Sequence, residues 1–372
     1  MSVNEDLANE AVRHAVDLQR YSNGVVRRMI ALLNRADNDL LTQIESALQR
    51  LPANSFTISR LEEVLFAARN TNIAAYRWME LDLPGELKEL ARYEAGYQHR
   101  AMTTVIPDAV LASVTVANIS AEQVYTAALS RPFQGGLLSD WAKKLPPDRM
   151  TKVRNAIRLG YVENQSISQI MRRLRGTRAR QYKDGILDIG RREAEIITRT
   201  AVGHMAAFTR DRFYEANTDV VKAVQWLSTL DTRTTEICRA RSGKRYTADT
   251  HKPIGHQMPW RNGPGRAHFG CRSTATPVTK SFRELGLDID DFSPSTQSSM
   301  DGQVPADLNF NQWLSKQSAA RQDDVLGPVR GRLFRQGKIP MERFYNRKGE
   351  FLTLDELKAR DSEAFARAGV SA

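Results

Sequence analysis

The sequence predicts a predominantly helical α+β protein, and three observations support this expectation. The first 145 residues or so carry apolar side chains at helical spacing, interrupted by turn signals such as LPANS (51–55) and RPFQGG (131–136). Residues 220–227, VVKAVQWL, change to a period of two and are rich in β-branched and aromatic side chains, which is typical of a strand. Residues 307–372 combine short helical patterns with a hairpin signal from Asn346 to Gly349.

Length and composition indicate a folded protein of more than one domain. The chain has 372 residues, of which 41% are hydrophobic and 26% are charged, and this is enough for two or three separate cores. We expect a helical N-terminal domain at 1–146 that docks onto another protein, and a small α+β domain at 147–284. A polar, turn-rich linker at 285–306 and a helical and hairpin module at 307–372 complete the predicted organisation.

The sequence gives no sign of membrane insertion or secretion. No stretch reaches the roughly 18 to 20 apolar residues that a membrane span needs. The first residues, MSVNEDLANEAVRHA, are acidic where a signal peptide would be basic and then apolar. Two cysteines cannot form a secreted-type disulfide framework, so we expect a protein made in a reducing cytoplasm.

The middle of the chain predicts a helix, a turn and two more helices. In RMTKVRNAIRLGYVENQSISQIMRRLRG, Gly160 is expected to end the first helix, and Ser166 or Ser168 to open the second. A long helix is expected at about 189–216. It precedes the predicted strand at 220–227.

A short helix is expected directly after that strand. Asp231 lies between the end of the predicted strand and the start of the predicted helix, so its carboxylate is predicted to cap the helix N-terminus. Thr234 and Thr235 would fill the first turn, with Cys238 one turn further on and Gly243 at the end.

Positive charge is concentrated in one part of the chain. The formal net charge is +11, and residues 149–199 alone hold 13 Lys or Arg against 5 Asp or Glu. The densest part is RRLRGTRAR (172–180), and we predict that its arginines contact the phosphates of double-stranded DNA without reading sequence. The alternative is that these arginines are solvated or paired with carboxylates, as arginines on helical faces usually are. The residues of this basic surface are Arg172, Arg173, Arg175, Arg178 and Arg180.

The two cysteines form the second candidate site, together with one histidine. Cys238 follows the predicted strand, and His268 and Cys271 lie in HFGCR (268–272). The H-x-x-C spacing suits zinc, which would need a fourth ligand from elsewhere. The residues available for that position are His251, His256 and Asp231.

Two other interpretations of these cysteines stay open. They could form a disulfide, which an oxidising environment would permit. Alternatively, they are two small buried thiols beside an ion pair of Asp231 with Arg272 or Arg233. The chain has no G-x-S-x-G, H-E-x-x-H or glycine-rich phosphate loop, so we expect no catalytic residues.

One ordered string of motifs resembles a known family. RTAVGHMAAFTRDRFYEAN, then VQWLSTLDTRTTEICRARSGKRY and then HFGCRSTATP are similar to the Mu F–like head-morphogenesis family of tailed-phage minor capsid proteins. The resemblance covers roughly residues 150–280. The matching positions that we treat as a fold motif are Trp226, Asp231, Arg233, Thr234, Gly243 and Arg272, alongside Cys238, His268 and Cys271.

The resemblance implies a structural role in phage assembly. It implies a minor head protein, not an enzyme, that joins the procapsid near the portal after synthesis in the bacterial host cytoplasm and resides in the virion interior. The implied partners are the portal protein, the major capsid or scaffolding protein, and packaged DNA, which the basic surface would suit.

Two positions depart from the pattern of the resembled family. Thr235 and Ser273 stand where family members often have cysteine, which removes half of a possible four-thiolate site. We therefore expect no cofactor, with zinc as the open alternative. The rival functions are a metal-dependent nucleic-acid-processing enzyme that uses Cys238, His268 and Cys271, and an effector injected with the genome.

Overall fold

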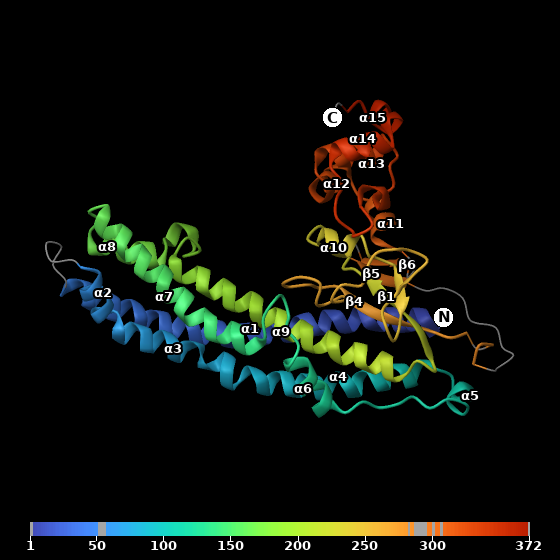
Figure 1. Cartoon of the computed structure of the whole chain (residues 1–372), viewed down its shortest axis with the longest axis horizontal. Helices are drawn as coiled ribbons and strands as arrows, with labels where there is room; N and C mark the ends of the chain where they lie inside the picture. The colour runs from blue at the N-terminus through green and yellow to red at the C-terminus, as the bar shows by residue number, and fades with distance from the viewer. Residues whose placement is uncertain are drawn as a thin grey trace. The chain divides into compact units, whose positions relative to one another are not determined.

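The computed structural model describes residues 3–50, 57–281, 283–285, 296–299, 302–305 and 308–370. Figure 1 labels most of its elements along the chain. In order these are α1 (Val3–Gln49), α2 (Ile58–Val64), α3 (Phe66–Leu81), α4 (Leu83–Val105), α5 (Asp108–Leu111), α6 (Ala121–Leu129), α7 (Leu138–Val162), α8 (Ile167–Arg175), η2 (Arg178–Arg180), α9 (Ile186–Ala216), β1 (Val221–Leu227), α10 (Glu236–Arg239), β2 (Arg245–Thr247), β3 (Pro253–Ile254), β4 (Thr274–Thr279), β5 (Thr296–Ser299), β6 (Gly302–Pro305), α11 (Phe310–Ser315), α12 (Ala319–Leu326), α13 (Pro328–Arg335), η3 (Met341–Phe344), α14 (Leu354–Arg360) and α15 (Ser362–Ala368).

The prediction of a predominantly helical α+β protein is confirmed. The chain divides into two compact units. The helical unit comprises Arg20–Leu90 and Tyr125–Met205, and the sheet unit comprises Met1–Gln19, Ala91–Val124 and Ala206–Ala372. Across the described part of the chain, no helix is both long enough and apolar enough to span a bilayer.

The helical unit is built around apolar stripes of its long helices. Leu40, Leu41 and Ile44 of α1 pack in one core with side chains from α3, α7 and α8. These residues recur at three- and four-residue steps, so each helix presents one apolar face to the others. The members contributed by α7 and α8 are Met150, Val153, Ala156, Ile157, Ile170, Met171 and Leu174.

Helix α7 runs without a break through the predicted domain boundary at 146/147. Pro146 and Pro147 lie inside it and supply no backbone N–H. The Asn72 side chain of α3 donates to the Pro146 carbonyl at 2.9 Å. This is a contact that helps to fix α3 against α7.

Gly160 does not end its helix as predicted. Helix α7 continues to Val162, and its C-cap is Glu163. Gly160 is buried where α8 crosses α7, and a Cβ at this position would lie 2.5 Å from Cγ1 of Ile170. The glycine therefore permits close helix packing, and the prediction was wrong because that requirement comes from a different helix. Ser166 opens α8 with a capping box as expected.

The sheet unit contains a four-stranded antiparallel sheet in the order β3-β2-β1-β4. The predicted strand at 220–227 is confirmed as β1, which occupies a central place in the sheet. Phe213 and Tyr214 of α9 and Met102 of α4 share a core with buried side chains of β1. The sheet is thus covered by helix residues from distant parts of the sequence.

The C-terminal residues belong to the same sheet unit. Leu230, Ala240 and Met258 belong to one apolar core with residues of α11 to α15. Arg239 of α10 donates to the Val325 carbonyl at 2.5 Å, and Arg241 donates to the Lys348 carbonyl at 2.9 Å. The module at 307–372 is therefore fastened to the region around α10 by polar contacts as well as by its apolar core.

The structure bears on two local predictions in the C-terminal part of the chain, a turn and a linker. The predicted turn from Asn346 to Gly349 is confirmed, because Tyr345 and Phe351 form an antiparallel bridge across it. The described residues of the expected linker at 285–306 differ from a plain linker, since β5 and β6 pair as an antiparallel hairpin. Hydrogen bonds between the backbone N–H and C=O groups of β5 and β6 hold the two strands together. The remainder of that segment lies mostly outside the described residues.

Candidate metal centre and basic surface

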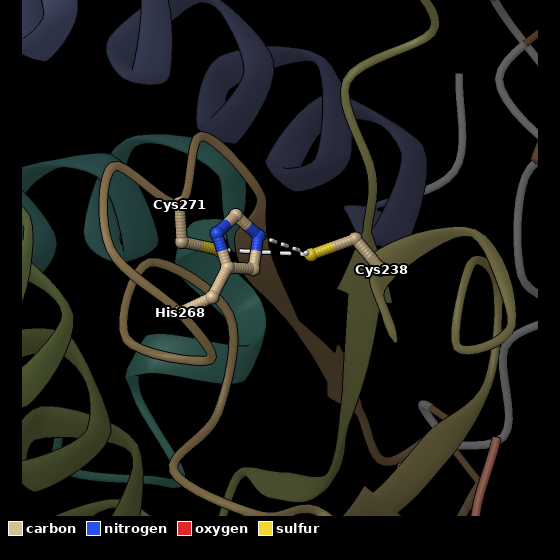
Figure 2. A group of neighbouring side chains, drawn as sticks. All are labelled: Cys238, His268 and Cys271. Atoms are coloured by element: carbon tan, nitrogen blue, oxygen red, sulfur yellow. Dashed lines mark hydrogen bonds between the residues drawn. The ribbon is translucent and has the colours of Figure 1, made fainter. Parts of the chain in front are cut away.

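Strand pairing brings the two cysteines and the histidine together. Cys238 lies in α10, which follows β1, and His268 and Cys271 lie in the loop that precedes β4. Because β1 and β4 are antiparallel neighbours, with Leu227 opposite Thr274, the end of one meets the start of the other. Figure 2 shows the side chains of His268 and Cys271 turned toward Cys238.

The three side chains form one compact set of ligand atoms. Cys238 Sγ lies 3.6 Å from Cys271 Sγ and 3.4 Å from His268 Nε2. All three ligand atoms lie within 4.8 Å of one another, and among the described residues this is the group that could hold a metal ion. Both cysteines are free thiols. Cys238 is buried, and the other two residues are half-buried.

The ring of His268 is held by its own loop. Its Nδ1 lies 2.9 Å from the carbonyl oxygen of Phe269, and its Nε2 lies 2.8 Å from Oγ1 of Thr235. A proton on Nδ1 that is donated to this carbonyl leaves the lone pair of Nε2 free to accept from the Thr235 hydroxyl or to bind a cation.

Cys271 is the thiol that ionises more readily. The hydrogen bond from Cys238 lowers the pKa of Cys271 well below its usual value, and the bond and charge of His268 add to this effect. The same hydrogen bond, followed by burial, raises the pKa of Cys238. Burial is the largest influence and lowers the pKa of His268, but the hydrogen bond and charge of Cys271 and the bond to the Phe269 carbonyl together outweigh it, so the net shift is upward.

Asp231 does not cap α10, and this prediction was wrong. The N-cap residue is Thr235. Asp231 instead accepts two hydrogen bonds from the Arg272 guanidinium, at 2.5 and 2.8 Å. Burial opposes ionisation of Asp231, but its bonds and charge interaction with Arg272 lower its pKa overall. The position of β4 in the sheet explains this difference, because it places Arg272, shortly before β4, within hydrogen-bonding distance of Asp231.

The other positions of the fold motif have structural contacts. Trp226 is fully buried, Thr234 donates to the carbonyl of Thr229 at 2.5 Å, and the N–H of Gly243 donates to the carbonyl of Trp226 at 2.8 Å. Gly243 therefore does not end α10, which stops at Arg239. The Arg233 side chain is 81% exposed and lies 4.0 Å from Asp231.

None of the three suggested fourth ligands joins the cluster. His251 stacks on Trp260, with ring centroids 4.5 Å apart. His256 is engaged with the carbonyl of Arg245 at 2.9 Å, and Asp231 is held by Arg272. Two hydroxyl side chains do reach the cluster: Thr235 contacts His268 and Cys238, and Ser273 contacts Cys238. The structure therefore assembles three ligands with hydroxyl groups beside them.

The basic surface lies on α8 and the loop that follows it. Arg172, Arg175, Arg178 and Arg180 are exposed. They have no carboxylate partner within salt-bridge distance among the described residues. Arg173 differs, because it pairs with Glu163 at 2.5 Å. The arginines in the last turn of α8 also interact favourably with the helix dipole, which is a purely structural role for part of this surface.

The loop at 176–185, which we call the basic loop, is closed at its base. Asp184 accepts hydrogen bonds from the backbone N–H and the hydroxyl of Thr177, both at 2.8 Å. Gly176 and Gly185 allow close backbone approach, since a Cβ on Gly185 would lie 2.4 Å from the carbonyl oxygen of Arg175. The loop therefore presents its side chains from a defined backbone.

Tyr182 is a surface residue that the sequence did not single out. It has a φ of 61° and follows Gln181, whose φ is 52°. Left-handed backbone is unfavourable for residues other than glycine and concentrates at functional positions. The Tyr182 side chain is 42% exposed in the same loop as Arg178 and Arg180. The glycines that flank TRARQYKD were the available signal for such a loop.

Comparison with known families gives a match over the middle of the chain. The model of the family described as Phage Mu protein F like protein matches residues 134–276. This confirms the resemblance seen in the sequence, and the matched range contains the basic surface, the three ligands and the fold motif. Comparisons with curated proteins and with solved structures gave no match.

Proposed function

Residues 134–276 carry a domain of the Phage Mu protein F like family, and from this we propose that the chain is a minor head protein of a tailed bacteriophage. It acts in procapsid assembly near the portal and remains in the virion interior. The family match is the observation that carries this proposal. The portal protein and the major capsid or scaffolding protein are its partners.

We further propose that the basic surface contacts double-stranded DNA. One short segment exposes five cationic side chains to solvent. Four are the arginines that have no carboxylate partner among the described residues, and the fifth is Lys183. Such charges bind phosphates by releasing counterions, and this gives affinity without sequence preference. The closed base of the basic loop favours binding because less order has to be acquired on contact.

A structural role accounts for these features more simply than an enzymatic one. The buried Trp226 and the paired Asp231 and Arg272 support the sheet and its loops, and the exposed arginines of the basic surface suit contact with phosphates. DNA cleavage by the purified chain that disappears in His268→Ala would instead establish the metal-dependent nucleic-acid-processing alternative.

Incorporation into heads is the direct test of the assembly role. We expect the chain to copurify with heads when it is coexpressed with the portal and major capsid proteins of the same phage. Quantitative mass spectrometry of gradient-purified heads would measure it, and coexpression without the portal should lower its copy number. A chain that stays entirely in the soluble fraction would contradict the proposal.

Neutralising the basic surface should weaken DNA binding and reduce its dependence on salt. In the variant with alanine at Arg172, Arg175, Arg178 and Arg180, we expect a loss of affinity on the order of tenfold or more. The slope of log K against log salt should fall by about 3 to 4, if each arginine neutralises one phosphate. Fluorescence anisotropy with a duplex of arbitrary sequence measures both quantities.

A charge-matched variant controls for the overall positive charge. Alanine at four exposed arginines elsewhere in the helical unit removes the same charge and should leave the salt slope nearly unchanged. Equal losses in both variants would show that net charge, rather than the basic surface, is responsible. The control positions are Arg27, Arg35, Arg50 and Arg77.

A further inference from the structure

We propose that Cys238, His268 and Cys271 bind one Zn²⁺ ion, with water as the fourth ligand. The ligand atoms are Cys238 Sγ, Cys271 Sγ and His268 Nε2, and they come from two segments that strand pairing holds together. The ion is a feature of the sheet unit itself, so the head-protein proposal does not depend on it.

Two of the three distances between these atoms agree with the edges of a tetrahedron around zinc, and the third is no longer than 4.8 Å. Zn–S bonds of about 2.3 Å and Zn–N bonds of about 2.0 to 2.1 Å give edges of roughly 3.8 Å between two sulfurs and 3.5 Å between sulfur and nitrogen. The corresponding distances are 3.6 Å from Cys238 to Cys271 and 3.4 Å from Cys238 to His268. An ion can therefore enter with small side-chain adjustments.

The surroundings of His268 favour metal binding through the correct nitrogen. Its Nδ1 faces the Phe269 carbonyl at 2.9 Å. Donation from a metal-bound histidine to a backbone carbonyl is the usual outer-shell arrangement, because it fixes the tautomer and the ring orientation. Two thiolates would neutralise the charge of the ion, and thiolate with imidazole is a ligand set that suits zinc.

A disulfide fits the geometry less well. A disulfide bond needs sulfurs about 2.05 Å apart, and those of Cys238 and Cys271 lie 3.6 Å apart. Its formation would also require an oxidant. The third interpretation, two buried thiols with no ligand, leaves the convergence of His268 Nε2 with both sulfurs without a role.

The open fourth position distinguishes this centre from a closed structural site. Thr235 Oγ1 lies 2.8 Å from His268 Nε2, so the hydroxyl stands next to the ligand atoms. A cysteine in place of Thr235 would add a thiolate on that side. We therefore expect Thr235→Cys to bind zinc at least about tenfold more tightly than the wild-type chain, because it completes a four-ligand set.

The test is metal titration of the full chain, purified without an affinity tag under reducing conditions and freed of metal. With Co²⁺ as the probe, we expect about one ion per chain, with tetrahedral d–d bands and sulfur-to-cobalt charge-transfer bands. Zinc should displace the cobalt, and a chromophoric chelator in competition gives the zinc affinity. Each of Cys238→Ser, Cys271→Ser and His268→Gln should weaken zinc binding on the order of a hundredfold.

His99→Gln is the matched control, because His99 lies outside the cluster and its replacement should leave zinc affinity unchanged. Thermal melts of the metal-free variants identify any that fail to fold, and Thr235→Cys keeps the test informative in that case because it predicts a gain. The proposal is overturned if two reactive thiols persist with no bound metal, if a disulfide forms in place of metal binding, or if His268→Gln binds zinc like the wild type.

Discussion

Replacing Arg149 with methionine should lower the free energy of unfolding of the helical unit by about 3 to 5 kcal/mol. The Arg149 side chain of α7 is 1% exposed and forms an ion pair with Asp37 of α1, which is 4% exposed. It also donates to the Asn72 side chain at 3.2 Å and lies over the ring of Tyr76, 5.8 Å from its centroid. Methionine fills similar space but leaves the buried Asp37 carboxylate with one fewer cation.

Urea unfolding followed by far-UV circular dichroism and by hydrogen exchange would measure the effect. Arg192→Met is the matched control, because Arg192 pairs with Asp188 from a side chain that is 63% exposed. Exposed pairs contribute about 0 to 1 kcal/mol. Combining Asp37→Leu with Arg149→Met removes both buried charges and should be less harmful than Arg149→Met alone. A loss below about 1 kcal/mol in Arg149→Met would contradict this account.

Replacing Trp226 with alanine should lower the free energy of unfolding of the sheet unit by about 3 to 5 kcal/mol. Trp226 is fully buried on the central strand β1. Its ring meets that of Trp260 edge to face at a centroid distance of 5.5 Å, and the Arg241 guanidinium lies 5.9 Å from its centroid. Alanine would leave a cavity between β1 and the loop that carries Trp260.

Near-UV circular dichroism and urea unfolding would report this loss. Trp226→Phe keeps an aromatic ring and should cost less than Trp226→Ala. Lys222→Ala is the control on the same strand, since Lys222 is exposed and pairs with Glu284 at 2.9 Å, and its replacement should cost about 0 to 1 kcal/mol. Equal effects of Trp226→Ala and Lys222→Ala would mean that the buried indole does not organise the sheet.

Features that depend on nearby residues could be predicted from the sequence. The strand at 220–227 follows from its period of two, and the turn from Asn346 to Gly349 follows from turn chemistry. Thr353 and Glu356 form the capping box of α14, which is a local feature because both partners lie within one helical turn. The family resemblance also lies in the sequence, since it depends on the order and spacing of motifs.

Features that depend on distant residues could not be predicted in the same way. Gly160 was expected at a helix end, yet it is required by the packing of Ile170 from α8. Asp231 was expected to cap a helix, yet Arg272 provides a closer partner from beyond the next loop. In each case a local signal was outweighed by a contact that only the assembled fold provides.

For the two candidate sites, the amino-acid sequence alone specifies which chemical groups are present. It supplies the arginines of the basic surface, and the two thiols and the imidazole that could share a metal ion. The meeting of Cys238, His268 and Cys271 follows from the assembled fold, because the pairing of β1 with β4 sets their separation. The assembled fold also determines that Arg149 is buried against Asp37 while Arg172, Arg175, Arg178 and Arg180 face solvent, since burial depends on which helices cover a side chain.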